Sequence, residues 1–283
     1  MPAAPVSPAP LTHSDTRKVL AAAVNATALF VLAYLLVQGA FLLATAGTAA
    51  RLGIRSVLHL GRLEFLLTDA QWWRAAVLAV YGVGPAAAVA LGLLALAGHV
   101  RYARRRRGLL KLFLLWVVLH ALNLALGALA TDTLTQSGTW YVPSWLFRAG
   151  NAVNVVAAVL TALLQLGLGF ALAPLFLQSH DSFTLMRFQN RRMLLLSTLL
   201  APWLAGSLLV AALHWPGQAL NEQLHFAALG LALGPLAVAS QYELPAATVP
   251  FPAKTRVAAG WLLVLATALV LWRLVLGHGV SFG

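Results

Sequence analysis

Cysteine is absent from the 283-residue chain, which excludes disulfide bonds, thiolate metal sites and a cysteine nucleophile. Acidic residues are scarce as well. The chain has 7 Asp and Glu against 19 Lys and Arg, and only 9% of its residues are charged. An ordinary soluble domain has about 25% charged residues. A chain with so few charged residues does not have enough of them for the surface of a soluble fold. The composition therefore excludes an ordinary soluble protein.

Several catalytic motifs are missing too. The sequence has no HExxH, so it lacks the zinc site built from two histidines and a glutamate. No serine stands in a G-x-S-x-G elbow, and no glycine-rich loop has the pattern of a phosphate cradle. His59 and Glu64 are five residues apart, which does not place them on one face of a helix. We therefore expect no catalytic centre, no metal and no cofactor.

Apolar residues make up 61% of the chain, whereas ordinary soluble domains have about 45–50%. A lipid bilayer can accommodate that much apolar surface, and each helical crossing takes about 20 residues. The composition predicts an all-α fold, a polytopic transmembrane helical bundle forming a single domain over residues 15–283. The proline- and alanine-rich residues 1–14 show no periodicity and predict a disordered tail.

Long apolar runs predict about seven crossings. They lie at about residues 19–50, 74–98, 110–131, 151–177, 193–213, 225–241 and 257–276. The first run exceeds the roughly 7–15-residue core of a signal peptide, which favours a retained helix, although the small residues of "ATAGTAA" leave cleavage as an alternative. The sixth run is short and contains Pro235. It is either a crossing or a re-entrant segment, which would reduce the count to six.

Residues 52–66 have a different pattern. Arg51, Arg55, His59 and Arg62 recur at helical spacing, and the apolar Leu52, Val57, Leu60 and Leu63 can lie on other sides. This pattern predicts an amphipathic helix that lies in the membrane interface rather than crossing it.

The basic residues predict the orientation. "RYARRRRGLLK" holds six Lys and Arg between two apolar runs, and such clusters stay in the cytoplasm. Alternation then places the N-terminus and the 99–111 loop inside, together with the loops that carry Arg187, Arg191 and Arg192 and Lys254 and Arg256. These four segments hold thirteen of the nineteen basic residues. We expect a multi-pass protein of a bacterial inner membrane whose Arg104, Arg105, Arg106 and Arg107 contact anionic lipids. Because no basic module lies outside the apolar runs, we expect no nucleic acid despite the net charge of +12.

Polar residues inside two consecutive runs form stripes at helical spacing. His120 and Asn123 lie on one run, and Thr161 and Gln165 lie on the next. Aligning the two antiparallel runs brings His120 level with Gln165 and Asn123 level with Thr161. The sequence therefore predicts an intramembrane polar cluster of these four residues. It is either a set of structural hydrogen bonds or a site that handles protons or a ligand.

One family resemblance follows from two short stretches. "YGVGPAAAVALGLL" is similar to the Gly-Pro helix of site-2-type intramembrane metalloproteases. Asn123 and Asp132 in "NLALGALATD" resemble the asparagine and aspartate of a later helix in that family, although they are nine residues apart rather than eight, and the intervening prolines and following glycines are missing. Without HExxH, the resemblance implies a non-catalytic relative of that scaffold.

These observations leave three functions. The first is a non-catalytic integral membrane protein that acts through helix packing or through a membrane partner, either another protein or a second copy. The second is a small transporter-like or proton-linked protein that uses the His120 cluster, which requires a hydrated cavity reaching His120. The third is a degenerate protease-like scaffold.

Overall fold

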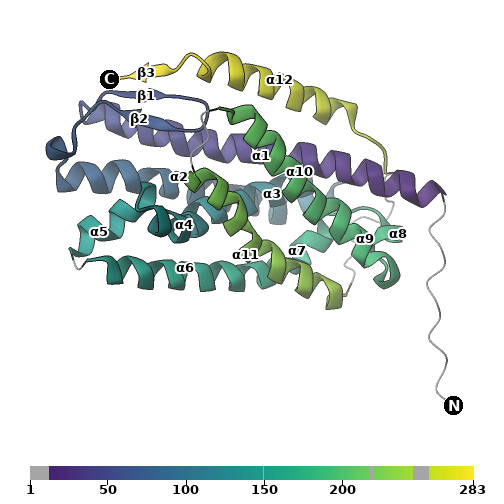
Figure 1. Ribbon diagram of the computed structural model, residues 1–283. Coiled ribbons are helices and arrows are strands. Elements are labelled where there is room, and N and C mark those ends of the chain that lie inside the picture. Colours follow the sequence, from purple (N-terminus) through teal and green to yellow (C-terminus); the bar gives the residue numbers. More distant parts are fainter. Residues whose placement is uncertain (1–12, 149, 217–219, 245–254) are drawn as a thin grey trace.

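The computed structural model describes residues 13–148, 150–216, 220–244 and 255–283 as a bundle of helices (Figure 1). Seven helical segments of this described part are long and apolar enough to cross a membrane, which confirms the all-α class. The helices of these segments are α1 (His13–Arg51), α2 (Arg74–Arg101), α3 (Leu110–Leu122), α4 (Ala128–Thr135), α6 (Asn151–Ala171), α9 (Arg191–Leu195), α10 (Ala201–His214), α11 (Leu220–Tyr242) and α12 (Ala259–Leu276).

Two of the seven segments contain a π-helical turn. Asn123–Gly127 joins α3 to α4, and Leu196–Leu200 joins α9 to α10. Helix α11 runs without a break through Pro235 over 23 residues, so the shortest predicted crossing is a full-length helix. The predicted tail lies outside the described residues up to position 12, and α1 already begins at His13.

Shorter elements connect the long helices. The short helices are α5 (Tyr141–Phe147), α7 (Ala173–Gln178) and α8 (Phe183–Met186), with 3-10 turns at Asp69–Gln71, Ala103–Arg105, Gly138–Trp140 and Phe188–Asn190. The strands are β1 (Ser56–Leu58), β2 (Leu63–Phe65) and β3 (Val280–Phe282).

Helix α1 forms the centre of the bundle and contacts α2, α3, α10 and α12 (Figure 1). Leu29, Phe30 and Val31 on successive faces of α1 are fully buried. A helix that is apolar on every side must be surrounded by other protein elements or by lipid, and here protein elements surround this part of α1. Phe30 packs edge-to-face on Trp116 of α3 with ring centroids 5.0 Å apart. The outer helices α6 and α12 instead expose large apolar side chains such as Leu163 and Leu271.

The predicted interfacial helix over residues 52–66 is wrong, because the segment forms a β-hairpin. Strands β2, β1 and β3 form an antiparallel sheet in that order, with Val57 opposite Glu64 on one side and Ser281 on the other. Exposure alternates along residues 62–66 with a period of two, which is strand periodicity. Pairing with the distant residues 280–282 stabilises the strands, and no local pattern at 52–66 reports that partner.

The bundle has two distinct ends (Figure 1). The end that carries the sheet, α5 and the start of α11 is called the hairpin end here. The opposite end carries the loops around residues 102–109, 179–190 and 255–258 and is called the arginine end. Consecutive long helices alternate between these ends, as a bundle of antiparallel neighbours requires.

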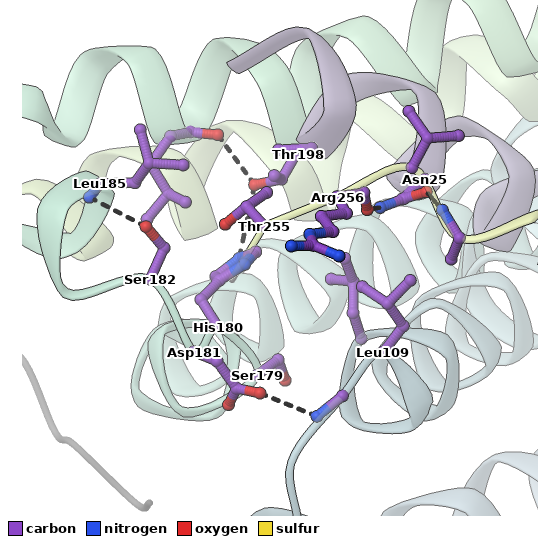
Figure 2. A pocket seen from close by; sticks show the side chains of 16 residues that line it. Asn25, Leu109, Ser179, His180, Asp181, Ser182, Leu185, Thr198, Thr255 and Arg256 are labelled. Carbon is purple, nitrogen blue, oxygen red and sulfur yellow. Dashed lines mark hydrogen bonds between the residues drawn. The ribbon is translucent and has the colours of Figure 1, made fainter. Parts of the chain in front are cut away.

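The arginine end contains a cavity of about 260 Å³ (Figure 2). In its wall, Asp181 pairs with Lys111 and accepts a hydrogen bond from the Gly108 backbone N–H at 2.8 Å. Asn25 of α1 donates to the Arg256 carbonyl at 2.7 Å and accepts from the Ala258 N–H at 2.8 Å. These contacts attach the loops of this end to α1 and α3.

His180 in this cavity should make the protein sensitive to acid. Burial, reinforced by the charge of Lys111 and opposed by Asp181, lowers the pKa of His180 to about 3. In the unfolded chain, His180 has its ordinary pKa of about 6.5. Between about pH 3 and 6.5 the unfolded state therefore binds more protons, and the free energy of unfolding rises with pH until it levels off above about pH 6.5. We expect His180→Gln to flatten the pH dependence of the thermal unfolding midpoint between about pH 4 and 6.5. His278→Gln, at an exposed histidine, is the control, and equal pH profiles for the two variants would contradict this prediction.

Candidate functional site

A cavity of about 360 Å³ opens at the hairpin end between α1, the hairpin, α4 and the start of α11. It is called the hairpin-end pocket here. The polar side chains that line it include Gln38, Thr45, Arg62, Asp132, Glu222 and His225. Two of the chain's seven acidic residues are therefore in this wall, and both are buried.

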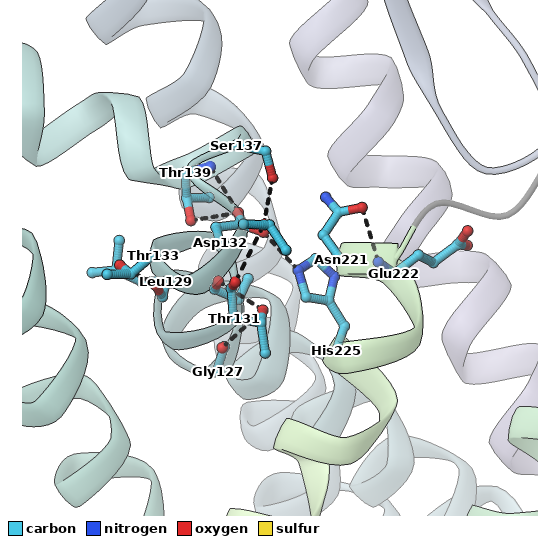
Figure 3. Close-up of polar contacts among 12 residues, drawn as sticks. Gly127, Leu129, Thr131, Asp132, Thr133, Ser137, Thr139, Asn221, Glu222 and His225 are labelled. Carbon is cyan, nitrogen blue, oxygen red and sulfur yellow. Dashed lines mark hydrogen bonds and ion pairs between the residues drawn. The ribbon is translucent and has the colours of Figure 1, made fainter.

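Asp132 lies near the end of α4, where the chain turns back over its carboxylate (Figure 3). Its Oδ2 accepts hydrogen bonds from the backbone N–H and the hydroxyl of Thr139, both at 2.8 Å. Its Oδ1 lies 3.0 Å from Nε2 of His225 on α11. Gly138 permits the tight turn, because its φ is +54° and an added Cβ would lie 3.1 Å from the Asp132 carboxyl carbon. Asp132 is thus held by three hydrogen bonds with 2% of its surface exposed.

Glu222 precedes His225 by three residues on the first turn of α11, and its carboxylate points away from the Asp132–His225 pair (Figure 3). Its Oε1 accepts a hydrogen bond from the Tyr34 hydroxyl at 2.9 Å and pairs with Nδ1 of the buried His214. The hairpin turn covers this pair at Gly61. An added Cβ there would lie 2.8 Å from His214 Nδ1 and 2.9 Å from each Glu222 oxygen, so any larger residue would displace the pair.

Two carboxylate–histidine pairs at one cavity allow a defined chemistry. A carboxylate removed from water is costly unless it is paired and hydrogen-bonded, and a histidine partner meets that need. Imidazole and carboxylate side chains both bind protons, so the Asp132–His225 and Glu222–His214 pairs are candidates for proton binding. Each proton then belongs to the pair rather than to one residue. In the described part of the chain, no group of three or more His, Asp and Glu side chains could hold a metal ion.

The structure corrects the predicted position of His120. Its ring packs against Phe30 and Tyr34 of α1, with centroid distances of 4.5 and 5.7 Å. His120 therefore faces α1, and the predicted contact with Gln165 or Thr161 of α6 is wrong. Residues three apart on a helix differ in direction by about 60°, so His120 can face α1 while Asn123 faces α6 and α11. His120 does not line the hairpin-end pocket.

The structure does bring Asn123 and Gln165 together. The Gln165 amide donates to Asn123 Oδ1 at 3.2 Å and to the Ala228 carbonyl of α11 at 3.0 Å. Asn123 in turn donates to the His225 carbonyl at 2.8 Å. The hydroxyl of Thr161 instead bonds to a carbonyl of its own helix. The predicted cluster is thus reduced to two amides that join the π-helical turn, α6 and α11.

This amide network should be measurable in stability. Interhelical hydrogen bonds in membranes average about 0.6 kcal/mol and reach about 1.7. We expect Asn123→Ala and Gln165→Ala each to cost about 1 kcal/mol and to be non-additive, because they remove the same bond. Thr161→Ala is the control and should cost less than half as much. A purely additive double variant in thermal unfolding would exclude the network.

The two carboxylate–histidine pairs were not part of the predicted site. Asp132 appears in the sequence only through the family resemblance, and His214, Glu222 and His225 were not singled out. One signal was available, because Glu222 and His225 share a helix face in a chain with very few acids. Asp132 lies 93 residues from His225, beyond any local pattern. His214 lies only 8 residues from Glu222, but on the preceding helix, so helical spacing does not pair them.

Comparison of the chain with protein-family models, curated proteins and solved structures found no match. The resemblance to site-2-type proteases therefore rests on the quoted stretches alone. A protease-like scaffold would bring Asn123 and Asp132 towards the first two helices. Asp132 shares the hairpin-end pocket with residues of α1 and α2, whereas the side-chain hydrogen bonds of Asn123 and Asp132 go to α6, α11 and the turn at Thr139. The resemblance stays a prediction.

Proposed function

We propose that this protein spans a bacterial inner membrane with its seven long helices and that the arginine end is cytoplasmic. Arg105, Arg106 and Arg107 are exposed at that end, where anionic headgroups would contact them together with Arg104. The apolar side chains exposed on α6 and α12 would then face lipid.

The absence of cysteine allows a direct test of this topology. Leu66→Cys at the hairpin end and Tyr102→Cys at the arginine end place a single thiol at positions that are 59% and 51% exposed. In intact cells, a membrane-impermeant maleimide should label Leu66→Cys and leave Tyr102→Cys unlabelled until the membrane is permeabilised. The reverse pattern would refute the orientation, and labelling of both from outside would refute the span count.

We infer that the protein is proton-linked and that the hairpin-end pocket is its protonation site. The observation that supports this function is the pair of buried carboxylate–histidine contacts in one cavity wall. Each contact joins two helices. Asp132–His225 links α4 to α11, whereas Glu222–His214 links α11 to α10 and, through Tyr34, to α1. Protonation of a carboxylate weakens the attraction across its pair, so proton occupancy would shift the position of α11.

The test measures access to the pocket as a function of pH. Ala128→Cys places a thiol in the pocket wall, and Leu134→Cys on the same helix, 77% exposed, corrects for the reactivity of the thiol itself. We expect the ratio of the two maleimide rates to change severalfold between about pH 5 and 8. Asp132→Asn and Glu222→Gln should make this ratio independent of pH. A constant ratio in the unsubstituted background would instead favour a protein that acts through packing or a partner.

A further inference from the structure

Two buried polar groups of the hairpin-end pocket have no hydrogen-bond partner among the described residues. Gln38 of α1 is 8% exposed and lines the cavity, yet its amide makes no hydrogen bond. Oε1 of Glu222 makes both of that carboxylate's contacts, which leaves Oε2 without a donor. Neither the Gln38 amide nor Glu222 Oε2 is fully enclosed by protein, and both residues line the cavity, so an amide and a carboxylate oxygen are available to a hydrogen-bond donor that enters it.

Three aromatic rings form one wall of the same pocket. The Tyr81 ring lies 5.8 Å from Phe65 and 4.9 Å from Tyr141, centroid to centroid, and all three rings line the cavity. Aromatic faces carry negative charge density and attract cations, most strongly where water is excluded. The wall therefore favours a ligand that combines a positive charge with an apolar body.

The charges of the lining agree with a cationic ligand. Two carboxylates, Asp132 and Glu222, face one guanidinium, Arg62, so the pocket is net negative when its histidine is neutral, in a chain of net charge +12. Both oxygens of Asp132 are already occupied by Thr139 and His225. Glu222 is thus the carboxylate available to a ligand.

We propose that the hairpin-end pocket binds a small organic ammonium ion, whose N–H groups donate to Glu222 Oε2 and to the Gln38 amide oxygen. Its apolar part would lie against the wall of Phe65, Tyr81 and Tyr141. A volume of about 360 Å³ admits only a small molecule. This inference rests on the proposed function, because a proton and an ammonium ion would compete for the same carboxylate.

Arg62 makes the test decisive. Its side chain is exposed, so Arg62→Gln should fold normally, and it removes the positive charge nearest the ligand. An ammonium ligand should then bind more tightly by about twofold, since a repulsion of like charges is lost. An anionic ligand would bind more weakly by a similar factor. The direction of the change therefore identifies the charge of the ligand.

The experiment uses the full chain in lipid nanodiscs and three probes of equal size: benzylammonium, benzyl alcohol and benzoate. Calorimetric titration should show binding of benzylammonium alone, weakened about tenfold or more by Glu222→Gln. Gln38→Leu and Tyr81→Leu leave the Glu222–His214 pair intact and should also weaken benzylammonium binding. These two variants replace Glu222→Gln as the test if that variant does not fold. Glu64→Gln, at an exposed hairpin carboxylate outside the pocket, is the control and should leave binding unchanged.

Three outcomes would overturn the proposal: binding of benzoate that Arg62→Gln weakens, equal binding of benzyl alcohol, or no binding of any probe. None of them depends on the pH-dependent maleimide experiment. Benzylammonium binding with a constant maleimide ratio would retain the ligand and refute the proton link. A pH-dependent ratio of maleimide rates without benzylammonium binding would support the proton link and refute the ligand.

Discussion

Asp132→Ala should destabilise the protein by about 3–5 kcal/mol, the cost of removing one partner of a buried pair. The change leaves His225 Nε2 and two donors of Thr139 without their acceptor in a buried site. Asp132→Asn retains acceptor oxygen and should cost clearly less. Thermal unfolding in detergent, with Thr139→Val as an intermediate case, would measure the series.

The chain offers a matched control for this prediction. Glu64 and His59 form the same kind of pair at 3.6 Å on the hairpin, with 56% and 36% of their side chains exposed. Exposed pairs contribute about 0–1 kcal/mol, so Glu64→Ala should be close to neutral. Similar losses for Asp132→Ala and Glu64→Ala would contradict the structural role given to Asp132.

Gly169→Val should be as damaging as the loss of the buried pair. An added Cβ at Gly169 of α6 would lie 3.1 Å from both Cα and the carbonyl carbon of Ala232 on α11. Backbone cannot move aside as a flexible side chain does, so the two helices must separate. Overpacking typically costs about 1–3 kcal/mol, and we expect the upper part of that range or beyond. Separation would also lengthen the Gln165 hydrogen bond to Ala228 one turn away.

Gly167 on the same helix provides the comparison, since an added Cβ there meets nothing within 4 Å. Gly167→Val should change the unfolding midpoint only slightly. The two glycines lie two residues apart on the same helix, and both variants introduce the same residue, so the difference in midpoint isolates the contact with α11. Equal midpoints would show that α6 and α11 do not approach as closely as the structure places them.

The long helices were predictable because their signal is local. A run of about 20 apolar residues predicts a helix from its own length and composition, whatever surrounds it. The run at 110–131 corresponds to a helical segment from Leu110 to Thr135, and the run at 225–241 corresponds to α11 despite Pro235. Net charge and the arginine cluster are likewise properties of the chain itself, so the expected orientation follows from them directly.

The hairpin and the pocket depend on contacts between distant residues. Arg51, Arg55, His59 and Arg62 fit a helical period, yet pairing of β1 with residues 280–282 produces strands instead. His120 fits a stripe with Asn123, yet the two side chains differ in direction by about 60°, so Asn123 contacts Gln165 while His120 contacts α1. Which helix packs on each side of α3 decides the partner of each side chain, and spacing alone does not report it.

By itself, the sequence determined the all-α class, the apolar helices, the scarcity of acids and the polar residues that required partners. Only the tertiary structure decided which partners they have. It placed Asp132 beside His225, Glu222 beside His214, and the open amide of Gln38 in the same pocket. The physical reason is that apolar helices of similar composition can pack in many arrangements of similar hydrophobic free energy. The choice among them depends on close contacts such as Gly61 over Glu222 and Gly169 against Ala232, which arise only when the helices meet.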